Sequence, residues 1–189
     1  MDLRETKDEK KEVKLHLGCG SIRIPGYINV DINNLESVDV VADISCLPYE
    51  ESSVDMIYSC ATIEHFSRRM WMKVLSHWYF ILKPGGVLRI STADFESVCK
   101  EYLENWKIEE LLGLVVGGQR DKYDMHGMVF DFDILKSGLE KCGFKEVRRY
   151  DRKNTDISKM GIDDYSQSYL PHMDFDTGRL MMLNVEAKK

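Results

Sequence analysis

Short apolar runs rich in β-branched residues alternate with amphipathic stretches along this chain, and this alternation restricts the fold more than any other feature. We predict seven strands from these runs, at Val13–Leu17, Tyr27–Ile32, Val38–Asp43, Val54–Ser59, Val87–Thr92, Phe144–Tyr150 and Leu180–Ala187. Such runs are typical of strands that are buried on both faces of a parallel sheet. Strands that alternate with helices therefore predict a doubly wound α/β domain.

The stretches between the strands carry apolar side chains three and four residues apart, the pattern of a helix with one buried face. We predict helices over Ser67–Leu82, Phe95–Trp106, Glu109–Val116 and Phe132–Cys142. Pro84-Gly85-Gly86 ends the first of them and turns the chain into the next strand. The segment Asp151–Arg179 has no convincing helical period, and a connection of that length is typical of a lid or a binding loop.

The composition indicates one domain with a sizeable core, because the chain has 189 residues of which 43% are hydrophobic. Ten of the first fourteen residues are charged, so we expect residues 1–13 to be a tail, or a linker within a larger polypeptide, and residues 14–189 to form the domain. No apolar run is long enough for a transmembrane helix. The net charge of −6 argues against nucleic acid as the main ligand.

Five cysteines are spread along the chain, at positions 19, 46, 60, 99 and 142, without a CxxC pair. This spacing suggests neither a disulfide framework nor a zinc site. We interpret them as small core residues in a reducing compartment, which predicts a cytoplasmic protein.

The most informative motif is Gly18-Cys19-Gly20, which directly follows the first predicted strand. Glycines let a backbone pass close to a ligand, although the same pair is also common in plain tight turns. The third glycine of the dinucleotide fingerprint is missing, since Arg23 stands there. The connection Ser21–Gly26 is too short for an ordinary crossover helix. A pyrophosphate on a long helix N-terminus is therefore disfavoured, and a nucleoside cofactor without phosphates fits better.

Two carboxylates follow at the ends of the next two predicted strands. Asp31 ends the second strand, where a carboxylate can accept hydrogen bonds from both hydroxyls of a ribose. Asp43 ends the third strand, where it could accept a hydrogen bond from the exocyclic amine of adenine while Ile44 packs on the ring. Asp43 could instead cap a turn.

The segments LHLGCG, YINVDI, VVADISCLP, VDMIYSCATIEHF, ILKPGGVLRIS and CGFKEV resemble, in this order, those of class I S-adenosylmethionine-dependent methyltransferases. They are most similar to small methyltransferases associated with the synthesis of surface polysaccharides and glycans. The resemblance spans roughly Val13–Tyr150. It implies a Rossmann-like, seven-stranded mixed sheet that is mostly parallel, with an antiparallel last strand and a shortened first crossover.

The resemblance also implies the cofactor site and the reaction. The cofactor would be S-adenosylmethionine, converted to S-adenosylhomocysteine, and its site would comprise Gly18, Cys19, Gly20, Asp31, Ile32, Asp43, Ile44, Ser59 and Cys60. Within this set Ser59 and Cys60 would line the methionine end with backbone groups. The Glu64-His65 pair would open toward the substrate, which we expect to be a hydroxyl of a sugar or glycan.

A hydroxyl acceptor needs a base, and three residues are candidates. We favour His126 assisted by Asp94, and His65 is the third candidate. Each has a structural alternative: Asp94 as the cap of a helix, His65 as a packing residue and His126 as an exposed loop histidine.

No metal is predicted. The acidic residues Asp121, Asp124, Asp131 and Asp133 lack a recognisable ligand spacing and suit a solvated loop better.

Several functions stay open from the sequence. The acceptor could be another small metabolite, and a non-catalytic domain that keeps the fold is the alternative outside enzymes. Arg120 and Lys122 could meet an anionic substrate such as a nucleotide sugar, or could simply be solvated. Because one domain uses almost the whole chain, we expect specificity to come from the loops Gly117–Asp131 and Asp151–Arg179.

Overall fold

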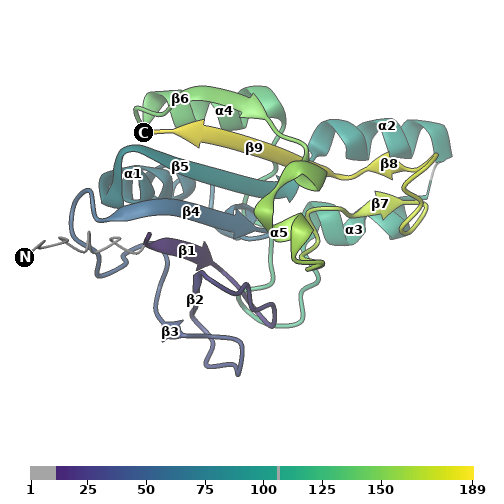
Figure 1. Cartoon of the computed structure of the whole chain (residues 1–189). Helices are drawn as coiled ribbons and strands as arrows, with labels where there is room; N and C mark the ends of the chain where they lie inside the picture. The colour runs from purple at the N-terminus through teal and green to yellow at the C-terminus, as the bar shows by residue number, and fades with distance from the viewer. Residues whose placement is uncertain (1–11, 106) are drawn as a thin grey trace, which may run out of the picture.

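A computed structural model describes residues 12–105 and 107–189, so most of the predicted tail at 1–13, and Trp106, lie outside the described residues. Its main sheet has the strand order β3-β2-β1-β4-β5-β9-β6 (Figure 1). The strands are β1 Lys14–Leu17, β2 Ile28–Asp31, β3 Val40–Val41, β4 Val54–Cys60, β5 Leu82–Ala93, β6 Lys145–Arg149 and β9 Met182–Lys188.

The strand directions confirm the predicted mixed sheet. The pairs from β3 through β5 are all parallel, whereas β9 runs antiparallel to both of its neighbours, β5 and β6. The strand predicted at Val38–Asp43 is reduced to Val40–Val41, and the Asp39 carboxylate next to it accepts hydrogen bonds from the backbone and side-chain nitrogens of Asn29. Among the described residues no helix lies between β1 and β4, so the first crossover is indeed short.

One face of the sheet is covered by α1 (Trp71–Ile81) and α4 (Phe132–Lys141). The predicted period places Trp71, Val74, Leu75 and Trp78 of α1 on the buried side, where Ile81 joins them, whereas Leu82, which the sequence assigned to this helix, begins β5. They pack in one core cluster with the apolar residues that alternate along the central strands. Burial of this apolar surface is the main stabilising contribution to the domain.

The opposite face is covered by the loop after β1 and by two short helices, η2 (Arg152–Asn154) and α5 (Asp156–Lys159). These helices, and the hairpin of β7 (Tyr169–Leu170) with β8 (Arg179–Leu180), correct the prediction of an irregular segment at Asp151–Arg179. Each helix is about one turn long, too short to show a helical period, and each is capped by a side chain, Asp151 or Thr155.

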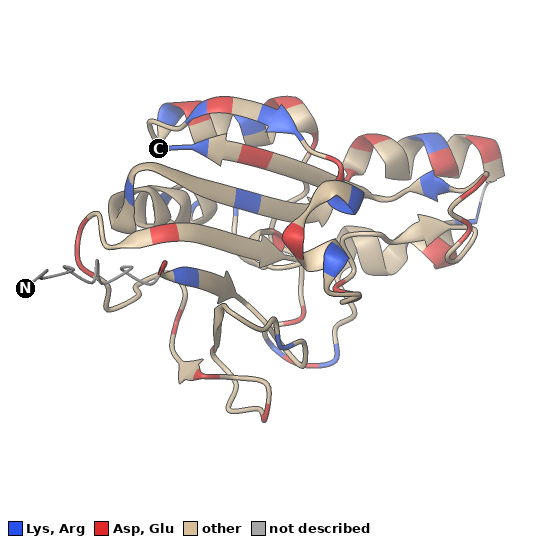
Figure 2. Cartoon of the chain, in the orientation of Figure 1, with Lys and Arg blue, Asp and Glu red and all other residues tan. Residues whose placement is uncertain are grey.

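The carboxyl ends of the parallel strands lie at one edge, where α2 (Phe95–Asn105) and α3 (Ile108–Val116) project beyond the sheet (Figure 1). The short helix η1 (Ile63–His65) follows β4 at the same edge. Charged residues are sparse on the central strands and frequent on α2, α4 and β6 (Figure 2). No helix in the described part of the chain is long and apolar enough to cross a membrane.

Candidate functional site

The glycine loop turns sharply where β1 ends. Gly18 has φ +69°, and a Cβ there would lie 2.4 Å from the side chain of Thr62, so only glycine fits. The backbone nitrogens of Gly18 and Cys19 both donate to the Val30 carbonyl oxygen, at 2.9 and 3.1 Å. This turn brings the loop against the end of β2.

Asp31 is the last residue of β2 and is fixed by two backbone groups. Its Oδ2 accepts a hydrogen bond from the Gly20 nitrogen and its Oδ1 accepts one from the Asn33 nitrogen, both at 2.8 Å. A carboxylate can accept about four hydrogen bonds, so these two leave capacity for a ligand. The glycine loop and the predicted ribose carboxylate are thus held together by a direct contact.

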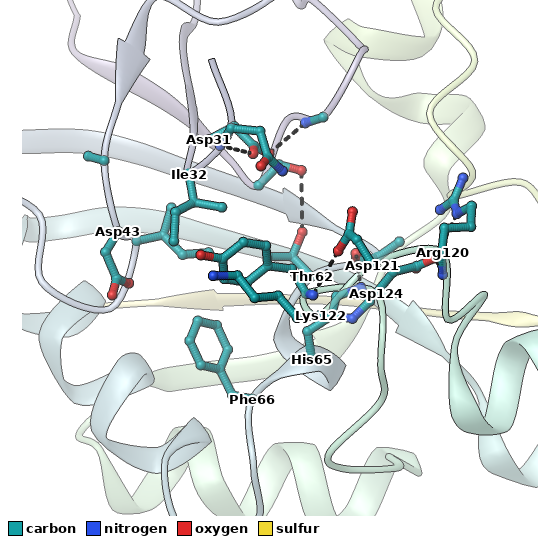
Figure 3. Close-up of a pocket in the computed structure, with 17 residues that line it drawn as sticks. Asp31, Ile32, Asp43, Thr62, His65, Phe66, Arg120, Asp121, Lys122 and Asp124 are labelled. Carbon is teal, nitrogen blue, oxygen red and sulfur yellow. Dashed lines mark hydrogen bonds and ion pairs between the residues drawn. The ribbon is translucent and has the colours of Figure 1, made fainter. Parts of the chain in front are cut away.

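These residues line a cavity of about 420 Å³, which we call the first cavity (Figure 3). Six of the predicted cofactor residues line it: Gly18, Gly20, Asp31, Ile32, Asp43 and Ile44. Asp43 also accepts a hydrogen bond from the Ser45 nitrogen at 2.8 Å, so it caps a turn while it faces the cavity. The sequence reasoning missed Thr62 and Phe66, although both lie in the motif ATIEHF that directly follows β4.

Residues 120–124 form another wall of the first cavity. Arg120 Nε lies 2.6 Å from Asp124 Oδ2, and this interaction lowers the pKa of Asp124 to about 2. Asp121 accepts a hydrogen bond from the Tyr123 nitrogen, and Asp131 caps α4. Among the described residues, no group of three or more His, Cys, Asp or Glu side chains could hold a metal ion.

A second cavity of about 530 Å³ adjoins the first, and both are lined by Gly18, Gly20, Ala61, His65, Arg120, Asp121 and Asp124. Cys19 and Cys60 line only the second. Burial raises the pKa of both thiols, that of Cys19 to about 12, so neither supplies a thiolate near neutral pH. Ser59 lines neither cavity, because its hydroxyl donates to the Leu17 carbonyl oxygen within the sheet.

His126 lies in the wall of the second cavity. Its Nδ1 is 3.1 Å from the Leu114 carbonyl oxygen and must donate to it, which leaves the lone pair of the neutral ring on Nε2. Burial, more than any other cause, lowers the pKa of His126 below its ordinary value of 6.5. This environment favours the neutral ring, the form that can accept a proton.

His65 packs edge-on against His126, with ring centroids 5.0 Å apart. Its Nδ1 and Nε2 each lie 3.2 Å from a backbone carbonyl oxygen, of Met125 and Ala61 respectively. Both nitrogens are therefore directed at the backbone, which corresponds to the structural alternative, a packing residue. The His65 ring connects the turn after β4 to the loop that carries His126.

The structure places Asp94 apart from His126, and the predicted assistance between them is not supported by this geometry. Asp94 lines neither cavity. Its Oδ1 accepts a hydrogen bond from the Glu96 nitrogen at the start of α2, and its Oδ2 lies 3.1 Å from Arg149. These contacts correspond to the structural alternative, a helix cap.

Residues 15–90 match the family model of a methyltransferase domain. A structure of an S-adenosylmethionine-dependent methyltransferase from Thermotoga maritima, described as a possible histamine N-methyltransferase, aligns with a TM-score of 0.59 at 17% identity, covering 94% of this chain and 82% of that one. A structure of an S-adenosylmethionine-dependent methyltransferase from Archaeoglobus fulgidus aligns with a TM-score of 0.58 at 17% identity, covering 95% of this chain and 87% of that one. At such identities the likeness shows the fold alone.

A further alignment is with the complex of the Haloferax volcanii Trm112 methyltransferase activator and a methyltransferase, with a TM-score of 0.53 at 14% identity, covering 94% of this chain and 82% of that one. No curated protein matches the sequence at a significant level. The comparisons thus support the domain type without indicating an acceptor.

Proposed function

We propose that the chain is a class I S-adenosylmethionine-dependent methyltransferase that transfers the methyl group to a hydroxyl of a sugar or glycan, and the family-model match over residues 15–90 and the shared fold support this proposal. One observation carries this proposal. Residues of the glycine loop and of the ends of β2 and β3 surround one cavity, which adjoins a second cavity lined by a histidine with an available Nε2.

The first cavity fits the nucleoside part of the cofactor. The remaining lone pairs of the Asp31 carboxylate suit the two ribose hydroxyls, and Ile32, Ile44 and Phe66 provide apolar surface for an adenine ring. Asp43 at the same wall suits the exocyclic amine. S-adenosylmethionine supplies a methyl group that is already activated by a sulfonium, so the protein has only to align the acceptor and exclude water.

His126 suits the role of general base toward a hydroxyl. Its Nε2 would take the hydroxyl proton as the acceptor oxygen bonds to the methyl carbon, while the carbon–sulfur bond breaks and S-adenosylhomocysteine leaves. The backbone hydrogen bond from His126 to the Val116 carbonyl oxygen, at 3.2 Å, and the contact of Nδ1 with Leu114 hold the ring in place.

The second cavity also supports a sugar as the acceptor. Its wall combines polar side chains with the exposed aromatic ring of Tyr165, and sugars present both hydroxyls and an apolar ring face. The motifs shared with glycan-associated methyltransferases point the same way. All five cysteines are free, as befits the cytoplasmic location that we propose.

Methyl transfer from labelled S-adenosylmethionine to a panel of glycosides, glycans and small amines tests the proposal. We expect the labelled methyl group to be incorporated into a sugar as a methyl ether that is stable to alkali. Incorporation into amines alone would contradict the proposal that the acceptor is a hydroxyl. Calorimetry supplies the separate test of the cofactor: if neither S-adenosylmethionine nor S-adenosylhomocysteine binds at millimolar concentration, the domain is a non-catalytic module.

A further inference from the structure

Glu64 is a buried carboxylate that no part of the proposed reaction uses. It lies in η1 with only 2% of its surface exposed, and it is one of the residues that line the second cavity. Its Oε2 has no hydrogen-bond partner among the described residues. A buried polar atom without a partner carries a cost in free energy, so such an atom beside a cavity indicates a ligand that completes it.

The backbone around Glu64 fixes its position relative to His126. The Glu64 carbonyl oxygen accepts hydrogen bonds from the nitrogens of Gly127, at 2.8 Å, and Met128, at 3.1 Å. A Cβ on Gly127 would lie 2.8 Å from the Phe66 carbonyl oxygen, so glycine is required for this close approach. Because residue 127 directly follows His126, these bonds hold the backbone of Glu64 beside the segment that carries His126, and both residues line the second cavity.

The charges around the second cavity give a further indication. Arg120 is the only lysine or arginine among the described residues that line it, and Arg120 is already paired with Asp124 at 2.6 Å. Arg152 lies behind the wall, buried against Asp164. Glu64, Asp121, Asp124 and Asp164 also line this cavity, so an anionic group that entered beside Glu64 would meet more carboxylates than cations.

We propose that Glu64 positions the acceptor by accepting a hydrogen bond from the hydroxyl next to the one that is methylated, and that it selects neutral polyhydroxylated acceptors over anionic ones. This inference rests on the proposed function and narrows its substrate class. A hydroxyl of a neutral glycoside donates a hydrogen bond to the Glu64 oxygen, whereas the negative charge of a uronic acid or a nucleotide sugar is repelled by the Glu64 carboxylate. The mechanism places two adjacent hydroxyls of one sugar against Glu64 and His126.

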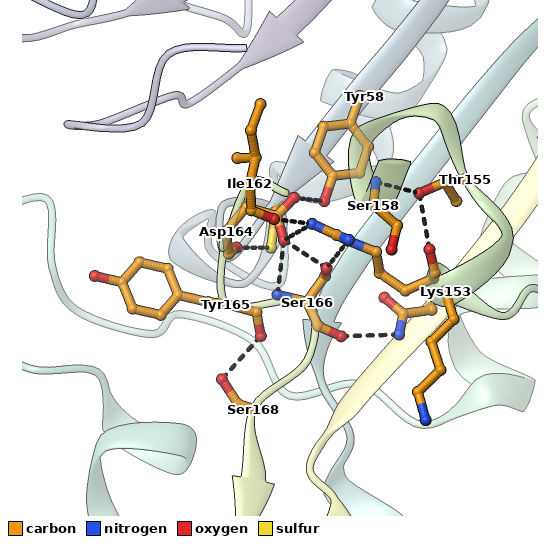
Figure 4. A network of polar contacts seen from close by, with 12 residues as sticks. Tyr58, Lys153, Thr155, Ser158, Ile162, Asp164, Tyr165, Ser166 and Ser168 are labelled. Carbon is orange, nitrogen blue, oxygen red and sulfur yellow. Dashed lines mark hydrogen bonds and ion pairs between the residues drawn. The ribbon is translucent and has the colours of Figure 1, made fainter. Parts of the chain in front are cut away.

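Tyr165 provides the complementary apolar contact. Its side chain is 62% exposed at the second cavity, and its φ of +67° is one that side-chain-bearing residues rarely adopt. The neighbouring residues hold it there: Ser166 donates to Asp164 at 2.5 Å and accepts from Arg152 at 2.9 Å, and Asp164 accepts from Tyr58 (Figure 4). A ring presented in this way can cover the face of a sugar.

The test compares a neutral methyl glycoside with its matched methyl glycosiduronate in wild type, Glu64→Gln and Glu64→Leu. Wild type should prefer the neutral sugar in kcat/KM by about tenfold or more. Glu64→Gln keeps an oxygen acceptor and loses the charge, so KM for the neutral sugar should change little and the preference should fall to about threefold or less. Glu64→Leu loses both, and KM for the neutral sugar should rise by about tenfold.

Two measurements make the result decisive. Each variant must bind S-adenosylhomocysteine with a Kd close to that of wild type, and Glu109→Gln, an exposed glutamate of α3, serves as the matched control. If wild type methylates sugars and both Glu64 variants keep its KM and its charge preference, the role of Glu64 is overturned while the proposed function stands. If wild type methylates no sugar, the proposed function fails, and this inference fails with it.

Discussion

The two cavities share the glycine loop but differ in how the chain builds them. Apart from the wall at 120–124, the first cavity takes its walls from short segments at the ends of β1, β2, β3 and β4, all between residues 18 and 66. The second collects residues from His16 to Met182, including α3 and the loops around His126 and Tyr165. The first is thus largely a product of local chain geometry, whereas the second depends on long-range packing.

The difference extends to the supporting structure. The Ile44 carbonyl oxygen in the first cavity accepts a hydrogen bond at 2.9 Å from Trp78 Nε1, and Trp78 belongs to the apolar core. The second cavity is supported by a buried polar network around Arg152 and Asp164. Apolar packing tolerates variation in detail, whereas a buried ionic network fails when one member is removed. We therefore expect substitutions to affect the two cavities separately.

The largest expected effect is that of Arg152→Ala. It leaves the Asp164 carboxylate buried without its cation, which should lower the free energy of unfolding by about 3–5 kcal/mol. Methyl transfer should be lost with it, since Tyr165 follows Asp164 in the wall of the second cavity. Urea unfolding and labelled methyl incorporation measure the two effects.

Arg148→Ala is the matched control for Arg152. The Arg148 side chain is 66% exposed and pairs with Glu186, against 3% for Arg152, so its loss should cost about 1 kcal/mol or less. Equal losses from the two substitutions would show that the buried network does not support the second cavity in the way proposed here.

His126→Ala should separate the cavities functionally. Loss of a general base lowers turnover by about 100-fold or more, equivalent to about 2.7 kcal/mol in the barrier. The Kd of S-adenosylhomocysteine should change by less than about twofold, because His126 does not line the first cavity, to which we assign the nucleoside part of the cofactor. Methyl-transfer assays measure the turnover, and calorimetry measures the Kd. An unaltered turnover would exclude His126 as the base.

The same contrast explains what the sequence could predict. Gly18, Asp31 and Asp43 were found because each lies at or next to the end of a predicted strand, and parallel strands end at one edge. Asp94 also follows a strand, but its pairing with Arg149, distant in sequence, left no local signal. The sequence period could not predict the one-turn helices η2 and α5 or the placement of Tyr165, because these depend on contacts between segments distant in the chain.

Asp31→Ala tests the first cavity with a smaller expected effect. It removes the carboxylate that holds the Gly20 nitrogen and suits the ribose hydroxyls, so cofactor affinity should fall by about tenfold or more, about 1.4 kcal/mol. Asp163→Ala, at an exposed position of the segment Asp151–Arg179, is the control and should leave the Kd unchanged. An unchanged Kd in Asp31→Ala would exclude Asp31 from the cofactor site.

The smallest effect is the response of the second cavity to pH. Because burial lowers the pKa of His126 below 6.5, its ring stays mostly neutral at pH 6.5, and kcat/KM should change by less than about twofold between pH 8 and 6.5. Below that range the unfolded chain binds the proton more readily than the folded one, so stability should fall together with activity as the pH drops. Cofactor affinity should stay level through the same range, because His126 lies outside the first cavity. A pH profile of kcat/KM already halved at pH 6.5 would show that the His126 ring titrates as a solvated histidine.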